Sequence, residues 1–393
     1  MTFEESAIKL GVEIPEGPIG LETLTSNLCS HALIDSLQEK FDLFGEYYAL
    51  VKTALSEIQK DEAMNTWLNC AARYYQLADH DHARDLPVPA TDGSLPRDLL
   101  PLMVLLPSIE RAYDLYVQNR GFSHEDAVGF LNCVKLNLSI VETRILGRPA
   151  LTVGYFRWLA HYMKATIFDH GGLNFELKKS TKTGVLLRNK KSGAYAVLCV
   201  REAVHRDGIP LGSAGYEDEE DSFSATFEES TAAFLGHPVK NFRIAREKEA
   251  FSKSEWEPIL KPEDDVINVH IPRKTNLSPE YVRKAYQEAR EIVARSYPDY
   301  TPKIFQCSSW LMDPTLTELL GKESRISQFG TPYLRYPNKS AGKEVFSFVF
   351  RPDDAKDLTQ LPENTTLERK LKEMYLQDKF IYAYTGFLPF DKI

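Results

Sequence analysis

Two short segments of the sequence carry side chains that could move a proton and hold an oxygen atom. His270 lies at the end of the apolar run at residues 266–271, and Ser308, Ser309 and Trp310 lie at the end of the apolar run at residues 303–311. An ordinary histidine has a pKa close to neutral pH, so an imidazole at a strand end can serve as a general base. Serine hydroxyls can donate hydrogen bonds to a carbonyl oxygen. These residue types therefore predict acid–base chemistry on a carbonyl compound.

A helix between the two runs would bring them to one edge of a sheet. Ser278, Pro279 and Glu280 have the residue types that favour an N-cap, a first helical position and a first turn. Apolar residues then recur at helical spacing through Val282, Ala285, Tyr286, Ala289, Ile292 and Val293. The pattern predicts a strand, a crossover helix and a second strand parallel to the first. Ligands of such sheets bind beyond the carboxyl ends of the strands, where His270 and Ser308 would lie.

The loop between the first strand and the helix could hold a phosphate group. The first N–H groups of a helix have no partner within the helix and favour anions. Arg273 and Lys274 in the loop would add positive charge. The alternative is a plain crossover, in which His270 is a structural histidine and both basic side chains face solvent.

The rest of the chain divides by its apolar spacing. Residues 1–172 show helical spacing, with an N-cap predicted at Ser123, and residues 173–393 show strands alternating with helices. Strands are predicted at residues 325–337, 344–350 and 380–388, among others. The layout predicts an α+β or α/β protein, with a helical N-terminal domain followed by a mixed β-sheet domain of six or more strands with flanking helices.

Several stretches resemble a family of two-domain acyltransferases with a helical N-terminal domain and a GNAT-like C-terminal domain. The matching stretches are HRDGIPLGSAG at 205–215, FEES at 227–230, GHPV at 236–239, residues 254–272, residues 277–299 and FQCSSWLMDP at 305–314. The resemblance implies transfer of an acyl group from acyl-CoA, such as acetyl-CoA, or from an acyl carrier protein thioester. The implied acceptor is the amine of a small molecule. GNAT enzymes thread the pantetheine arm between two splayed strands, which here would be 266–271 and 303–311.

The resemblance also implies roles for individual residues. His270 would take the ammonium proton, and Ser308 and Ser309 would hold the carbonyl oxygen. The implied cofactor-binding residues are Ile271, Arg273, Lys274, Ser278 and Trp310, with Trp310 as a wall of the acyl pocket. The implied substrate-binding residues are Arg206, Asp207, Glu228 and His237.

One departure from the GNAT pattern supports a different function. The loop that holds the cofactor pyrophosphate in GNAT enzymes has the form Gln/Arg-x-x-Gly-x-Gly/Ala, whereas residues 273–277 read RKTNL. Side chains in place of glycine restrict the approach of backbone to a ligand. The alternative function is therefore a non-catalytic GNAT-like protein that lost its cofactor loop and binds a small ligand or a partner.

Two further residues have a functional and a structural interpretation. Cys307 could be a nucleophile that carries the acyl group, but a buried, unreactive thiol is favoured. A hydrolase that uses Cys307 or a serine is a third possible function, but the sequence has no GxSxG motif to support it. Asp313, which precedes Pro314, is favoured as the cap of a short helix over a catalytic acid.

Composition narrows the partners. The chain of 393 residues carries a net charge of -9 without a basic tract, which argues against nucleic acid. No apolar run approaches the roughly 18 residues that cross a bilayer, and the acidic N-terminus is unlike a signal peptide. Five scattered cysteines indicate reduced thiols, so a cytoplasmic protein is predicted. His80, Asp81 and His82 lack the spacing and third ligand of a metal site, and no metal is predicted.

Overall fold

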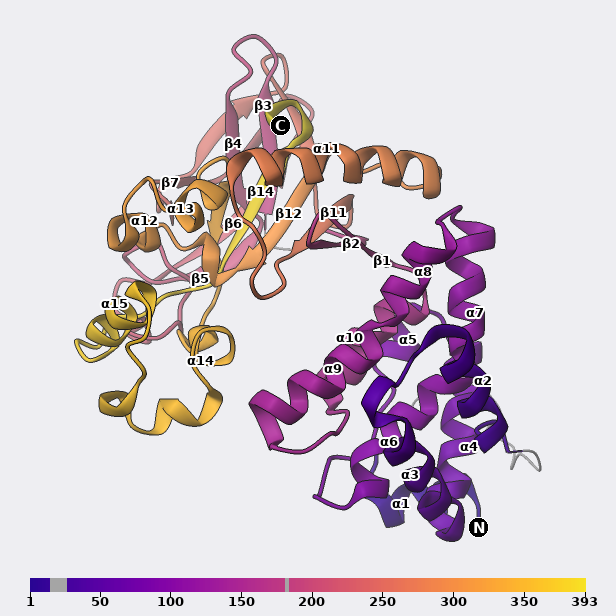
Figure 1. Ribbon diagram of the computed structural model, residues 1–393. Coiled ribbons are helices and arrows are strands. Elements are labelled where there is room, and N and C mark those ends of the chain that lie inside the picture. Colours follow the sequence, from indigo (N-terminus) through magenta and orange to yellow (C-terminus); the bar gives the residue numbers. More distant parts are fainter. Residues whose placement is uncertain (15–26, 181–183) are drawn as a thin grey trace. The chain divides into compact units, whose positions relative to one another are not determined.

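The computed structural model describes residues 1–14, 27–180 and 184–393. The contacts divide the chain into two compact units, Met1–Phe168 and Asp169–Ile393. The sequence predicted the boundary after residue 172. Figure 1 shows a first unit built of helices and a second that contains the strands.

The first unit is a helical bundle around an aromatic core. The apolar stripe of one helix, Val51, Ala54, Leu55 and Ile58, is buried, as helical spacing requires. Ser123 accepts a hydrogen bond from the Asp126 N–H in a capping box, which confirms the predicted N-cap. The helices are α1 (Phe3–Leu10), α2 (His31–Phe41), α3 (Tyr48–Lys60), α4 (Glu62–Leu77), α5 (His80–Arg84), α6 (Leu95–Leu105), α7 (Ile109–Asp114), α8 (His124–Leu131), α9 (Cys133–Ile140) and α10 (Val153–Met163).

Lys164, which follows α10, gives this unit a pH-dependent stability. Its ammonium donates to the carbonyl oxygens of Tyr75 at 2.8 Å and Ala78 at 2.6 Å. Desolvation by burial, aided by the charge of Arg111, lowers the pKa of Lys164 from 10.5 to about 8. The unfolded chain therefore binds the proton more tightly than the folded chain, so folding is penalised below about pH 8 and the penalty disappears as the pH rises toward 10.5.

We expect this penalty to be visible in the difference between wild type and Lys164→Met. The free energy of unfolding of wild type, relative to the variant, should rise by about 1–2 kcal/mol between pH 8 and pH 10, allowing for solvent screening of a partly exposed group. Urea denaturation at several pH values measures it. Parallel stability curves for the two proteins would show that Lys164 keeps its ordinary protonation in the folded state.

The second unit contains two β-sheets. Within the described residues, the first sheet has six strands in the order β1-β2-β11-β12-β14-β13, and the second has the path β10-β3-β4-β7-β6-β5, with β8 and β9 also paired to β7. The first comprises β1 (Ile167–His170), β2 (Leu173–Lys179), β11 (Asp265–His270), β12 (Ile304–Ser309), β13 (Leu334–Pro337) and β14 (Tyr384–Pro389). The second comprises β3 (Gly184–Asn189), β4 (Tyr195–Cys199), β5 (Arg201–Val204), β6 (Phe223–Glu229), β7 (Ala233–Lys240), β8 (Arg243–Ile244), β9 (Glu249–Ser252) and β10 (Trp256–Leu260).

The predicted crossover unit is confirmed. Strands β11 and β12 are parallel and are joined by α11 (Pro279–Ser296), whose N-cap is Ser278. Figure 1 shows α11 beside the sheet of β11, β12 and β14. The Tyr286 ring of α11 stacks on Phe305 of β12 at 4.5 Å between centroids, so the helix covers one face of the first sheet.

The opposite face of the first sheet packs against the second sheet. Val266, Ile304 and Phe387 of the first sheet share an apolar cluster with Leu186 and Val197 of the second. Side chains alternate between faces along a strand. Even-numbered residues of β11 and β12 therefore face the second sheet, and odd-numbered residues face α11.

One predicted strand is wrong and another is only partly correct. Residues 344–350 form α14 (Glu344–Phe348), and the run 325–337 begins with α13 (Arg325–Gly330) and only ends as a strand, β13. A short apolar run does not distinguish a strand from a buried helix. Here Val345, Phe346 and Phe350 are buried in one cluster with residues of α15 (Thr366–Tyr375) and α12 (Thr315–Leu320), and this packing stabilises the helix.

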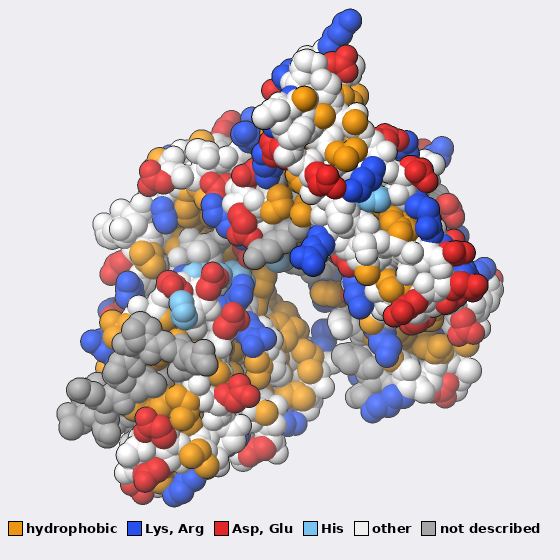
Figure 2. Space-filling model, turned by 180° about the vertical axis from the view of Figure 1, so that it is seen from behind, with side chains coloured by type: hydrophobic (Ala, Val, Ile, Leu, Met, Phe, Trp, Pro, Cys, Tyr) orange, Lys and Arg blue, Asp and Glu red, His pale blue; other side chains and the backbone are white. Residues whose placement is uncertain are grey.

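The described helices include none that is long and apolar enough to cross a membrane. On the face seen in Figure 2, basic and acidic side chains of the described residues are interspersed.

Candidate functional site

The parallel strands β11 and β12 stop pairing before they end. Their ladder ends at the pair Asn268 and Gln306. Beyond it, β11 continues against β2 as far as His270, and β12 continues against β14 as far as Ser309. No further pair joins the two in the described part of these strands. Residues 269–270 and 307–309, which we call the unpaired strand ends, therefore leave backbone groups that can bond to a ligand.

His270 lies at the unpaired strand ends and is held by a buried carboxylate. Its Nε2 is 2.8 Å from Oε2 of Glu176, whose side chain is 7% exposed against 34% for His270. Asn268 Nδ2 donates to the same Oε2 at 2.8 Å. A carboxylate is an acceptor only, so Nε2 of the neutral imidazole carries the proton and donates it, which leaves Nδ1 as the basic nitrogen.

The two predicted serines lie on opposite faces of β12. Ser308 shares the His270 face of the sheet by alternation, and its hydroxyl is 2.8 Å from Oγ1 of Thr385 on β14. Ser309 lies on the α11 face, and its Oγ accepts the Leu311 N–H at 3.1 Å. The structure thus brings Ser308 to the same face as His270, and it uses the Ser309 side chain to cap a 3₁₀ turn at Trp310–Met312.

Trp310 lies in the core of the second unit. It is 7% exposed and belongs to the apolar cluster of Leu316, Phe346 and Leu371. Its indole ring therefore contributes to the packing of α12, α14 and α15. No contact of the described residues joins it to His270.

The loop from β11 to α11 is held by hydrogen bonds within the loop and to the turn between β1 and β2. Thr275 Oγ1 donates to the carbonyl oxygens of Gly172, at 2.9 Å, and Pro272, at 2.7 Å. Lys274 has φ 64°, a left-handed conformation that a glycine adopts at less cost. Ser278 is the N-cap but makes no side-chain capping bond within the described chain, and its N–H donates to Asn276.

Apart from Trp310, the residues predicted to bind the cofactor lie close together in this loop. Ile271, directly after β11, is partly exposed. Arg273 donates from Nη1 to the carbonyl oxygen of Phe348. Lys274 and the N-terminus of α11 complete the short segment between His270 and the helix. The predicted cofactor residues other than Trp310 therefore form one continuous loop next to the unpaired strand ends.

The family of the chain follows from a match over its second unit. A family model described as the GNAT-like C-terminal domain matches residues 167–388, more than half of the chain. The chain belongs to this family. The resemblance seen in the sequence is thereby confirmed, together with the helical region that precedes the GNAT-like domain.

Solved structures share the fold over nearly the whole chain. An acyltransferase in complex with decanoyl-CoA and teicoplanin is 16% identical, with a TM-score of 0.65, over 99% of each chain. An acyltransferase in complex with CoA and 10C-teicoplanin is 17% identical, also with a TM-score of 0.65 and 99% of each chain covered. At these identities the likeness concerns the fold. No curated protein matches the chain.

Three of the predicted substrate residues of the GNAT-like domain are exposed, and two of them, Arg206 and Glu228, lie in ion pairs. Arg206 is 3.4 Å from Asp218, and Glu228 is 2.7 Å from Lys248. Asp207 is 3.4 Å from the ring of His205, and its carbonyl oxygen accepts from Arg243. No contact among the described residues joins these three side chains to His270.

His237, the fourth predicted substrate residue, is buried between the two sheets. It pairs with Cys199 across β7 and β4, so its side chain shares the face of Cys199, which belongs to the core between the sheets. Its Nδ1 is 3.1 Å from the carbonyl oxygen of Ala245, and its buried Nε2 has no partner among the described residues.

The two residues with alternative interpretations have structural roles in the GNAT-like domain. Cys307 is 1% exposed on the α11 face, and desolvation raises the pKa of its thiol to about 12. A thiol that stays protonated is a poor nucleophile, so the favoured interpretation, a buried and unreactive thiol, is confirmed. Asp313 accepts the N–H of Thr315 at 2.8 Å and of Tyr382 at 2.7 Å, so it joins the start of α12 to the segment before β14. It is not the N-cap itself, which is Pro314.

Sequence reasoning missed Glu176, Asn268 and Gln306. They lie side by side in register on three adjacent strands, on the face of His270. Asn268 and Gln306 interrupt otherwise apolar strands and are 3% and 0% exposed. A polar residue at a position that alternation predicts to be buried was the available signal, because burial of an amide is unfavourable unless it is bonded.

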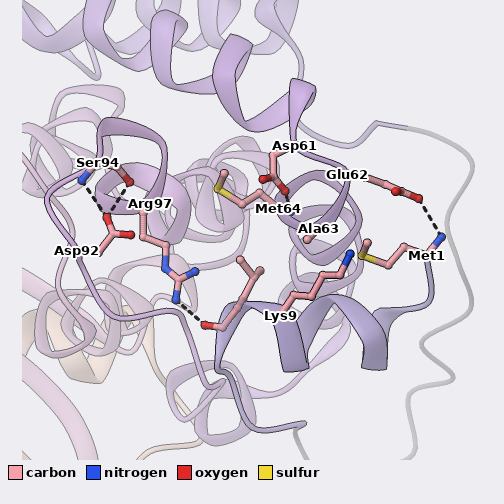
Figure 3. A pocket seen from close by; sticks show the side chains of 10 residues that line it. Met1, Lys9, Asp61, Glu62, Ala63, Met64, Asp92, Ser94 and Arg97 are labelled. Carbon is pink, nitrogen blue, oxygen red and sulfur yellow. Dashed lines mark hydrogen bonds and ion pairs between the residues drawn. The ribbon is translucent and has the colours of Figure 1, made fainter.

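A separate pocket of about 490 Å³ opens in the helical unit. Figure 3 shows that its polar groups bond to one another, with the N-terminal amino group paired to Glu62 and Ser94 bonded to Asp92. Arg97 donates to the carbonyl oxygen of Leu10. These groups bind the ends of α1, α4 and α6 together, so we assign the pocket no part in the site.

Proposed function

We propose that the protein is an N-acyltransferase that moves an acyl group from acyl-CoA to the amine of a small molecule. One observation carries the proposal. A histidine oriented by a buried carboxylate lies where the parallel ladder of β11 and β12 ends. A base that is fixed in orientation and lies next to unbonded backbone groups is what acyl transfer to an amine requires.

The chemistry is a substitution at the thioester carbonyl. The ammonium of the acceptor gives a proton to Nδ1 of His270, and the neutral amine attacks the carbonyl carbon. A C–N bond forms and the C–S bond breaks. The thiolate of CoA leaves and takes up a proton, for which the imidazolium is the nearest acid in the site. Backbone N–H groups of the unpaired strand ends and the Ser308 hydroxyl are the donors to the carbonyl oxygen.

The residues present fit a CoA thioester as the donor. An extended pantetheine arm can bond to the unpaired strand ends as a further strand would. Its phosphates would lie at the N-terminus of α11, near Ile271, Arg273, Lys274 and Ser278, where charge and backbone N–H groups favour anions. The acyltransferases of the same fold were crystallised with CoA and decanoyl-CoA. An acyl carrier protein presents the same arm and is the other source of a thioester.

The acceptor we propose is an amine of a small molecule in the cytoplasm. Two acyltransferase structures of the same fold contain teicoplanin and 10C-teicoplanin. Within this proposal Arg206, Asp207 and Glu228 contact the outer part of the acceptor, since they are exposed. His237 has a buried nitrogen that can accept a hydrogen bond from the amine or a hydroxyl.

Acyl-CoA should stabilise the purified protein. At a concentration 100 times Kd, binding adds about 2.7 kcal/mol to the free energy of unfolding, which raises Tm by roughly 5–10 °C for a domain of this size. Differential scanning fluorimetry with acetyl-, octanoyl- and decanoyl-CoA measures the shift and ranks acyl chain length. Acyl-pantetheine, which has the same thioester arm but no phosphate groups, serves as the control for the phosphate contacts.

The outcome separates two functions. A shift in Tm together with release of free CoA thiol in the presence of an amine supports the transferase. A shift without release, over a broad panel of amines, supports the second candidate, a GNAT-like binding protein, which the left-handed Lys274 in a loop without glycine favours. The absence of any shift up to millimolar acyl-CoA would contradict a CoA-dependent function.

A further inference from the structure

Gln306 ends the β11–β12 ladder with a buried oxygen that lacks a partner. The residue is 0% exposed, and Oε1 has no hydrogen-bond donor among the described residues. Buried polar atoms in native proteins are almost always bonded, so such an atom calls for an explanation. Its place on the face of His270, at the last paired position before the unpaired strand ends, points to a ligand.

The orientation of the amide follows from a chain of hydrogen bonds that starts at a charge. The Glu176 carboxylate can only accept, so Asn268 must direct Nδ2 toward it, at 2.8 Å. Asn268 Oδ1 then faces Gln306 and accepts from Nε2 at 3.5 Å. Gln306 is thereby oriented with Nε2 toward β11, and Oε1 is left as the free acceptor at the end of the chain.

We propose that Gln306 Oε1 accepts a hydrogen bond from an N–H group of the bound substrate at the unpaired strand ends. This inference rests on the proposed function and assigns a positioning residue to it. Two substrate groups have the required chemistry: an amide N–H of the pantetheine arm, and the ammonium or amine N–H of the acceptor. Each of these groups can donate a hydrogen bond to Oε1. They belong to different substrates, so the affinity for CoA and the affinity for the amine can be measured separately.

In the protein without substrate, Gln306 Oε1 has no donor among the described residues, and in this proposal the bound substrate supplies one. A buried acceptor without a donor is unfavourable, and a ligand N–H that removes this penalty gains affinity by it. We expect the gain to be about tenfold in Kd, the usual contribution of one neutral hydrogen bond in a buried site.

The test is Gln306→Met, which keeps the length of the side chain and removes its acceptor. If the pantetheine arm supplies the donor, the Kd for CoA measured by calorimetry rises about tenfold and the KM for the amine is unchanged. If the acceptor substrate supplies it, the KM for the amine rises about tenfold and the Kd for CoA is unchanged. In both cases Tm stays within a few degrees of wild type, because loss of the long 3.5 Å hydrogen bond to Asn268 is offset by removal of the unmet acceptor.

Two further variants keep the test decisive. Gln306→Glu, neutral because it is fully buried, donates through its O–H to Asn268 and keeps a carbonyl oxygen in place of Oε1, so it should bind within about threefold of wild type. Tyr75→Phe removes another buried oxygen without a partner among the described residues, in the core of α4, and should leave both constants unchanged.

The results that overturn the inference are distinct from those that overturn the function. Unchanged Kd and KM in Gln306→Met, with Tm raised or lowered, would show that Oε1 faces no ligand. An equal loss of affinity in the Glu and Met variants would show that the oxygen itself is not what the ligand uses. Wild-type protein that neither binds acyl-CoA nor releases CoA thiol would overturn the proposed function and this inference together.

Discussion

His270→Ala is expected to lower kcat by about 10²–10⁴-fold while changing Tm little. The size follows from the usual contribution of a positioned general base. The small change in Tm follows because the side chain is 34% exposed and leaves no apolar cavity. Release of the CoA thiol at saturating acyl-CoA and amine gives kcat, and a thermal melt of the same preparation gives Tm.

The second unit contains a matched control for this variant. His170 on β1 also bonds a glutamate, with Nε2 2.9 Å from Oε2 of Glu288, and its side chain is 33% exposed. His170 has the same side chain as His270 and nearly the same exposure. Its partner Glu288 lies on α11, however, whereas the partner of His270, Glu176, is buried in the sheet. His170→Ala should therefore keep kcat within about twofold. Equal effects of the two variants on Tm with no difference in kcat would make His270 a structural residue.

The crossover unit was predictable because its signals are local. The residue types at Ser278, Pro279 and Glu280 and the apolar stripe of the helix depend on sequence neighbours alone, and the structure places α11 where they indicate. His270 and Ser308 could be expected at one edge of a sheet for the same reason. Ser309 could not be separated from Ser308 until the alternation of β12 was known.

Glu176 could not be found in this way because its role depends on strand register. It precedes His270 by 94 residues in the chain, and only the antiparallel pairing of β2 with β11 places it opposite Asn268. Nothing in the stretch LNFELKK distinguishes this glutamate from a solvent-facing one. Strands β3 and β4 of the second sheet lie in runs with a strand pattern, GVLLR and AYAVLCV, but nothing in these runs shows that their sheet packs on the face that carries Glu176.

Within the proposed reaction, the burial of Glu176 makes it important for catalysis through its contact with His270. Its carboxylate accepts from Asn268 and His270 and is 3.9 Å from the Lys178 ammonium. In a poorly solvated site such a charge fixes the tautomer and the orientation of the imidazole, and in the proposed reaction it would stabilise the imidazolium that forms when the amine is deprotonated. The proposed function therefore assigns Glu176 the role of a positioning residue that acts through His270.

Glu176→Gln is expected to lower kcat by about 10²-fold with KM for both substrates within about threefold. The amide keeps the shape of the side chain but can donate as well as accept, so the imidazole is no longer held with its proton on Nε2. Stability should change by less than about 1 kcal/mol, because replacing a buried charge by a neutral group of equal volume removes a desolvation penalty along with the ion pair.

Glu288→Gln provides the comparison, since it alters the other histidine–glutamate pair at nearly the same distance, and it should leave kcat unchanged. The split between kcat and KM is what identifies the role. A structural glutamate would lower Tm and leave the kcat of the folded fraction intact, and a substrate contact would raise KM. A loss confined to kcat, at constant Tm, is expected only if the carboxylate orients the base, and the reverse pattern would remove Glu176 from the mechanism.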